Sequence, residues 1–374
     1  MAMTRNAIID GWRGLSVLMV LVGHLNVSRL GKEGRGIPFQ RMLNEPFDWF
    51  AFLANAALRI TYWLPDTGVQ IFFVISGYLI TSLLLREEDL CGKISIPAFY
   101  VRRFFRIVPA YAVFLLVALA LGQSGAISLG HTDVSTAAAF LCNTTVHLCS
   151  WGVAHTWTLA VEEQFYLGWP FLFVLFGSRY RVAGLIVTIA FLLTLSAVGW
   201  LRVDGWIDNS ISFATIGIGA LYATSKLAQR FVSTHAKSVA LLLAGGLILA
   251  RPFLSKVPGY ELLLPFVIGF VFFGSLQPGN WLGLTLSWKP LRNVGLISYS
   301  LYLWQQLFTF PLQTYPEGSW LSFPLLAFGL AAVSFLCIER PMIKLGHVLS
   351  DVVGRGVYFS LLRGPYLWRG RHRP

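Results

Sequence analysis

The chain has 374 residues, of which 56% are hydrophobic and only 12% are charged, and its formal net charge is +12. Soluble domains carry about 25% charged residues, so this composition excludes an ordinary soluble protein. Apolar segments long enough to cross a bilayer recur along the chain, and they predict an all-α, polytopic transmembrane bundle of about ten spanning helices. The expected spans are residues 8–27, 69–85, 107–123, 157–177, 182–201, 209–225, 237–251, 260–276, 294–312 and 319–338.

The distribution of basic residues predicts the topology of these spans. Residues 134–148 are apolar but interrupted by polar side chains, and we leave them out of the count. With the N-terminus in the cytoplasm, most of the 29 Lys and Arg residues then fall on cytoplasmic ends and loops, which is the positive-inside pattern. We therefore expect both termini in the cytoplasm, a transmembrane domain over residues 1–345, and a basic cytoplasmic tail over residues 346–374 that is drawn to the lipid bilayer.

The first apolar segment carries three ionisable residues, Asp10, Arg13 and His24. Arg13 and His24 are eleven residues apart, so on an α-helix they project from one face and are separated by about 16 Å of rise. Ionisable side chains in a spanning helix are costly and rarely face lipid, which makes each of them a candidate for function. The alternative for His24 is a histidine that only packs between helices.

Three arginines precede the third expected span. The spacing of Arg102, Arg103 and Arg106 favours a single helical face. Together with Arg13 they would form an anion site at the cytoplasmic mouth of the bundle. Guanidinium groups bind phosphate through paired hydrogen bonds, so this site predicts a phosphorylated ligand. The alternative is that these arginines only mark the cytoplasmic side of the membrane.

Two adjacent carboxylates, Glu162 and Glu163, lie in the fourth expected span, which begins outside near Trp157. They are then about 8 Å below the outer surface, whereas His24 is about 20 Å from the inner surface, so the two sites lie at similar depth. An acid beside an imidazole can orient the ring as a base, and Glu162 is therefore the predicted partner of His24. The alternative places both carboxylates at a solvated loop edge.

An anion site, an apolar path and an imidazole together fit acyl-coenzyme A, which has a phosphorylated head and a thioester at the end of a long arm. His24 would take the proton from an acceptor hydroxyl as that hydroxyl attacks the thioester carbonyl. We expect no permanently bound cofactor, no metal and no nucleic-acid partner. The competing class is a proton-coupled transporter or exporter, in which an intramembrane His and Glu form a relay.

The four cysteines show no CxxC motif and no zinc spacing. Cys142 and Cys149 are the only two that are close in sequence, and they could form a disulfide if their loop faces an oxidising compartment. Two unpaired thiols are the alternative.

Six ordered stretches, spread from about residue 7 to residue 345, resemble acyltransferase family 3. These integral-membrane acyltransferases O-acylate bacterial surface glycans, lipo-oligosaccharides and macrolides, and the resemblance implies that His24 is catalytic and acts with Arg13. The sequence differs from many members at three positions, with Gln70 in place of Asp, Ala160 in place of Ser and Gln305 in place of His. The six stretches are Asp10-Gly-Trp-Arg13-Gly…His24, residues 68–80, residues 102–111, His155-Thr-Trp157-Thr-Leu-Ala-Val-Glu162-Glu-Gln-Phe-Tyr166, Ile297-Ser-Tyr299-Ser-Leu-Tyr302-Leu-Trp304 and Ile338-Glu339-Arg340-Pro341.

The sequence thus predicts a multi-pass O-acyltransferase of a bacterial inner membrane. It would transfer an acyl group, most simply acetyl, from cytoplasmic acyl-CoA to a hydroxyl of a carbohydrate or glycolipid acceptor. The predicted catalytic residues are His24 and Glu162. The residues predicted to bind the donor or the acceptor are Arg13, Asp10, Arg102, Arg103, Arg106, Ser76, Glu163, Tyr299 and Tyr302.

Overall fold

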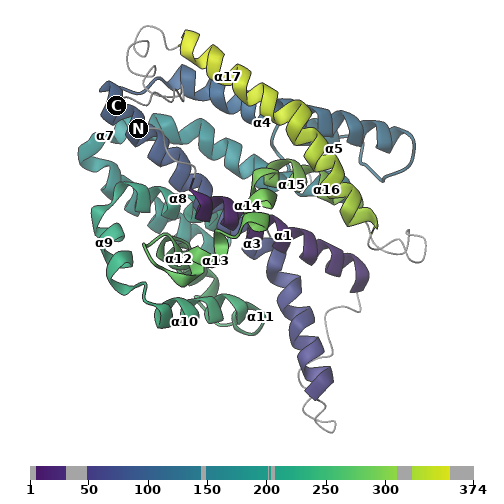
Figure 1. Ribbon diagram of the computed structural model, residues 1–374, viewed down its shortest axis with the longest axis horizontal. Coiled ribbons are helices and arrows are strands. Elements are labelled where there is room, and N and C mark those ends of the chain that lie inside the picture. Colours follow the sequence, from purple (N-terminus) through teal and green to yellow (C-terminus); the bar gives the residue numbers. More distant parts are fainter. Residues whose placement is uncertain are drawn as a thin grey trace, which may run out of the picture.

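The computed structural model describes residues 6–30, 49–144, 149–200, 202–203, 207–309 and 322–353. This part of the chain is a bundle of helices, as the composition predicts (Figure 1). Its only strands are the two-residue β1 (Arg202–Val203) and β2 (Ile207–Asp208), which pair antiparallel within the described ranges. The helices are α1 (Ala7–Leu30), α3 (Trp49–Cys91), α4 (Ile96–Gln123), α5 (Asp133–Ala138), α6 (Trp151–Ala154), α7 (Thr156–Ala197), α8 (Asn209–Thr224), α9 (Lys226–His235), α10 (Ser238–Leu249), α11 (Arg251–Leu254), α12 (Tyr260–Ser275), α13 (Trp281–Leu286), α14 (Lys289–Leu296), α15 (Ser298–Gln305), the 3₁₀ helix η2 (Gln306–Phe308), α16 (Ser322–Ser334), the π-helical turn η5 (Phe335–Glu339) and α17 (Arg340–Val353).

Several of these helices have the length and composition of membrane spans, which supports a multi-pass membrane protein. Five helical segments in the described residues meet this test, and a sixth does so if α8 and α9, which meet at a 93° bend, are counted as one span. Ten spans are therefore not confirmed. The five segments are Ala7–Leu25, Arg59–Cys91, Ile96–Gln123, Trp151–Ala197 and Pro324–Val353.

The expected spans that fall short of the test are shorter or broken. Helices α10 and α12 have 12 and 16 residues, below the roughly 20 that a perpendicular span requires. The segment predicted as one span over residues 294–312 is divided among α14, α15 and η2, because the chain leaves helical geometry at Ile297. Conversely, α7 covers both spans expected over 157–177 and 182–201, and it is broken at Gly177, whose φ of 57° only glycine adopts readily.

Helix α3 packs against both α1 and α8, its first turns extend beyond the other helices, and α17 lies along α4 on one side (Figure 1). Glycines allow the close contact with α8. A Cβ added to Gly77 would overlap the carbonyl oxygen of Ile216, and one added to Gly219 would overlap that of Val74. Small residues of this kind let helix backbones approach each other within a membrane. This packing holds one face of α3 in place for the site described below.

A buried arginine joins the first half of α3 to α11 and α12. Arg251 forms ion pairs with Asp66 and, at 2.7 Å, with Glu261, and its guanidinium lies over the ring of Trp63. Burial alone would lower the pKa of Arg251, but the two carboxylates outweigh this effect and raise it above its ordinary value. Arg251 therefore stays charged and fastens three helices together.

Cys142 and Cys149 form a disulfide, with their Cα atoms 5.6 Å apart, which decides between the two alternatives left open by the sequence. Helix α5 has six residues, so the interrupted apolar stretch over residues 134–148 contains no spanning helix in its described part.

At the other end of the chain, α17 continues to Val353, across the predicted boundary at residue 346. The rest of the predicted tail, residues 354–374, lies outside the described residues.

Candidate active site

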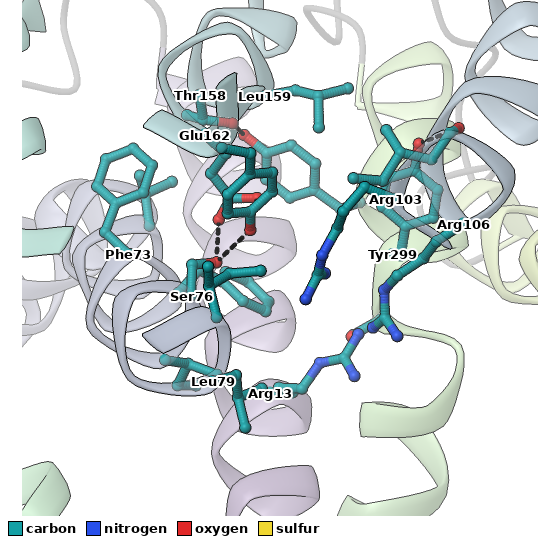
Figure 2. A pocket seen from close by; sticks show the side chains of 18 of the residues that line it. Arg13, Phe73, Ser76, Leu79, Arg103, Arg106, Thr158, Leu159, Glu162 and Tyr299 are labelled. Carbon is teal, nitrogen blue, oxygen red and sulfur yellow. Dashed lines mark hydrogen bonds between the residues drawn. The ribbon is translucent and has the colours of Figure 1, made fainter. Parts of the chain in front are cut away.

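A cavity of about 860 Å³, its open mouth included, lies between α1, α3, α4, α7 and α15. Figure 2 shows three guanidinium groups converging at one end of this cavity, with Glu162 and Ser76 on the opposite wall. The rest of the wall is largely apolar and aromatic. The lining residues are Arg13, Val69, Phe72, Phe73, Ile75, Ser76, Leu79, Ile80, Arg103, Arg106, Ile107, Thr158, Leu159, Glu162, Tyr166, Ser298, Tyr299, Tyr302 and Leu303.

Three of the four predicted arginines meet in this cavity. Arg103 and Arg106 are three residues apart on α4 and reach the cavity from one helical face, where they meet Arg13 of α1. Arg102 does not join them, because it points to α3 and donates to Glu87 at 2.9 Å. The arginine cluster, which we define as Arg13, Arg103 and Arg106, therefore comes from two helices that are distant in sequence.

The carboxylate of Glu162 is held in a hydrogen-bonded group on the cavity wall. It accepts a hydrogen bond from Ser76 at 2.6 Å, and the Tyr166 hydroxyl lies 3.3 Å from its second oxygen and 2.9 Å from Ser76. The guanidinium of Arg103 lies 5.2 Å from the centre of the Tyr166 ring, at the distance of a cation–π contact. This group links the arginine cluster to α3 and α7.

The two predicted tyrosines line the cavity from α15. The Tyr299 hydroxyl donates to the carbonyl of Ile107 at 2.8 Å, and so ties α15 to α4. The Tyr302 hydroxyl lies 2.7 Å from the Thr158 hydroxyl and 3.1 Å from the carbonyl of His155, and so ties α15 to α7. Tyr302 and Thr158 thus meet across the cavity wall.

Besides Arg102, two other residues predicted to contact a ligand do not line the cavity. Asp10 is 6% exposed and lies where α1 packs against α14, with Gly295 directly on its carbonyl. Glu163 follows Glu162 on α7, but one of its carboxylate oxygens is buried without a hydrogen-bond partner in the described part of the chain. Neither side chain therefore contributes to the wall of the cavity.

His24 does not line the cavity either, and the register of α15 and α7 places it one turn beyond two residues that do. On α15, Tyr302 lines the cavity, and Gln305, one turn further on, accepts a 3.0 Å hydrogen bond from His24 Nδ1. On α7, Thr158 lines the cavity and His155 precedes it by one turn, with its ring centre 5.5 Å from that of Tyr302. We call His24, His155 and Gln305 the histidine layer.

In the structure His24 Nδ1 is hydrogen-bonded to Gln305 Oε1 and not to the predicted partner, Glu162. Glu162 is bonded to Ser76 and Tyr166, and it lies two turns along α7 from His155, so the structure does not pair it with His24. Gln305 was visible in the sequence only as a departure from the histidine common in the resembling family. His155 was visible only as part of a motif, although it is 4% exposed with both ring nitrogens unpartnered among the described residues.

The fold and the site define a helical membrane protein with an internal cavity that three arginines line and an imidazole beyond it. The chain belongs to the acyltransferase domain family, whose model matches residues 6–339, and the family predicted from the six motifs is thereby confirmed. Membership of this family favours an acyltransferase over the transporter alternative. No solved structure matches the chain.

Curated relatives agree with this assignment. The chain is 28% identical to the peptidoglycan O-acetyltransferase OatA of Listeria monocytogenes over 91% of this chain and 56% of the relative. It is 28% identical to a putative O-acetyltransferase of Staphylococcus aureus strain COL over 79% of this chain and 49% of the relative. It is also 28% identical to the O-acetyltransferase OatA of Staphylococcus aureus over 76% of this chain and 54% of the relative. The chain thus spans about half the length of the curated relatives that it matches.

Proposed function

We propose that this protein transfers an acetyl group from cytoplasmic acetyl-CoA to a hydroxyl of a cell-wall or surface carbohydrate, within a bacterial plasma membrane. The observation that carries the proposal is the arrangement along one axis: three arginines at one end of a cavity, and His24 one turn beyond its other end. The relatives, which are named as O-acetyltransferases and in one case as acting on peptidoglycan, support an acetyl donor and a carbohydrate acceptor.

The arginine cluster suits the phosphates of the donor. Guanidinium groups form paired, charge-assisted hydrogen bonds with phosphate oxygens, and the three groups of Arg13, Arg103 and Arg106 converge at one end of the cavity. The apolar wall that follows suits the thin arm carrying the thioester. By the positive-inside pattern this end faces the cytoplasm, where acetyl-CoA is made.

His24 is proposed as the general base, and Gln305 sets its protonation. The Gln305 amide nitrogen donates to Gln306 at 3.2 Å, which leaves its oxygen to accept from His24 Nδ1. With the proton held on Nδ1, the Nε2 atom of His24 carries the lone pair that a base requires. Gln305 thereby takes the orienting position that the sequence assigned to Glu162.

In the proposed step, His24 Nε2 takes the proton of the acceptor hydroxyl as the hydroxyl oxygen attacks the carbonyl carbon of the thioester. A carbon–oxygen bond forms, the carbon–sulfur bond breaks, and the sulfur of the departing coenzyme A takes up the proton. The products are an O-acetylated carbohydrate and free coenzyme A.

The thioester must pass Tyr302 to reach the histidine layer. The hydroxyls of Tyr302 and Thr158 close the end of the cavity through their 2.7 Å hydrogen bond. Rotation of the Tyr302 side chain breaks this bond and the 3.1 Å bond to the His155 carbonyl, and it separates the ring from those of Phe72 and His155. We therefore assign Tyr302 the role of a gate between the donor cavity and the base. Glu162, through Ser76 and Tyr166, holds the wall on which the arm lies.

The test uses the purified chain in liposomes, supplied with acetyl-labelled acetyl-CoA and a peptidoglycan-type oligosaccharide. We expect label in the oligosaccharide and one free coenzyme A thiol for each ester formed. A transporter would instead move a substrate and leave the thioester intact. Intact acetyl-CoA in the presence of the folded protein and this acceptor class would contradict the proposal.

A further inference from the structure

A second cavity lies on another face of α3, about 1070 Å³ in volume with its open mouth included. Tyr78 and Ser82 of α3 line it, whereas Leu79 and Ile80 of the same helix line the first cavity, so α3 separates the two. The remaining walls come from the end of α8, from α9 and from the segment that follows α12. The lining residues are Tyr78, Ser82, Tyr222, Ala223, Lys226, Gln229, Arg230, Ser233 and Gln277.

The side chains of this second cavity carry two positive charges and no negative one. Lys226 and Arg230 lie one turn apart on α9 and both line the cavity. No carboxylate lines it, and among the described residues neither cation has an ion-pair partner. The other polar groups are hydroxyls and amides, which donate hydrogen bonds to oxyanions.

Helix α9 has the features of a helix that lies at the surface of a membrane. It follows the apolar α8 at a bend of 93°, and Ser225 caps its first turn by accepting from the Ala228 amide. Leu227 and Phe231 on α9 are 78% and 56% exposed. Such a helix carries basic residues on one face and exposed apolar residues beside them, and it lies across the end of a spanning helix. This combination is typical of the membrane interface. The cytoplasmic interface, where the positive-inside pattern places these residues, is rich in anionic lipid.

We propose that the second cavity binds the phosphate group of an anionic phospholipid, with Lys226 and Arg230 as its cationic ligands. The phosphate oxygens accept from the two cations and from the hydroxyl of Ser82, while the glycerol lies toward Tyr78. The site is separate from the donor cavity, and its existence does not depend on the proposed acyl transfer.

The test measures lipid binding to the full chain in detergent by native mass spectrometry. Phosphatidylglycerol is compared with zwitterionic phosphatidylcholine, and glycerol phosphate serves as a soluble competitor. The variant K226Q/R230Q is compared with K237Q/K289Q, which also removes two positive charges, from exposed residues that do not line the cavity. Thermal unfolding of both variants checks that the fold is kept.

We expect K226Q/R230Q to lower the affinity for phosphatidylglycerol at least tenfold, with less than a twofold change in K237Q/K289Q and none for phosphatidylcholine. Glycerol phosphate at high concentration should displace phosphatidylglycerol from the wild-type chain, because both present the same phosphate group to Lys226 and Arg230. Equal losses in the two double variants, or no loss in either, would overturn the proposal.

Discussion

The orienting role of Gln305 gives a prediction that the sequence alone would not suggest. The substitution Gln305→Leu keeps the size of the side chain and removes the acceptor that holds the proton on His24 Nδ1 at 3.0 Å. A buried or partly buried hydrogen bond contributes about 0.5–1.5 kcal/mol, and Gln305 is fully buried, so the upper part of this range applies. Since about 1.4 kcal/mol corresponds to a tenfold change in rate, we expect kcat to fall about five- to tenfold.

The assay is acetyl transfer at saturating acetyl-CoA, with the KM for acetyl-CoA measured in parallel. The KM should change less than twofold, because Gln305 lies beyond the donor cavity. Gln305→His, which offers a ring nitrogen as acceptor, should retain more activity than Gln305→Leu. Gln123→Leu, at an exposed position at the end of α4, is the matched control. A wild-type kcat in Gln305→Leu would refute the assignment of Gln305 as the positioning residue for His24.

Three further predictions test other parts of the site and fold. Arg106→Gln should raise the KM for acetyl-CoA by about ten- to a hundredfold, as expected for the loss of one charge-assisted hydrogen bond of about 1.5–3 kcal/mol. Arg102→Gln should change this KM less than twofold, because Arg102 pairs with Glu87 outside the cavity. Equal effects of the two substitutions in steady-state kinetics would contradict the placement of Arg106 inside the donor site and Arg102 outside it. Tyr302→Phe removes the bond that closes the cavity, so hydrolysis of acetyl-CoA without acceptor should increase several-fold in a thiol-release assay, and unchanged hydrolysis would argue against a gate. Replacing both members of the Cys142–Cys149 disulfide with serine should lower the free energy of unfolding by about 2 kcal/mol, read as a lower Tm; an unchanged Tm would show that the bridge adds no stability.

The parts of the site that could be predicted from the sequence are those set by spacing along one helix. Arg103 and Arg106 share a face because they are three residues apart, and both line the cavity. Arg102, which the spacing placed on the same face, instead pairs with Glu87 of α3. The spacing within α4 carries no information about that partner.

Contacts across the bundle were beyond prediction. His24 and Gln305 are separated by 281 positions, and the carboxylate expected beside His24 was chosen from depth alone. Depth places residues along the membrane normal but not around it, so Glu162 could face Ser76 and Arg103 as well as His24. The all-helical fold followed directly from hydropathy. The number of spans did not, because an apolar stretch such as 294–312 can break into short helices when it contains buried serines and glutamines.

The most direct test of the central claim is a comparison of His24→Gln with the wild-type chain in single-turnover acetyl transfer, together with the Kd for acetyl-CoA. The control is His131→Gln, at an exposed position outside the site. Loss of a general base lowers rates by about 10²–10⁴, so we predict a loss of that size with a Kd within twofold of wild type. Full transfer by His24→Gln, or a loss explained entirely by weaker acetyl-CoA binding, would contradict the account.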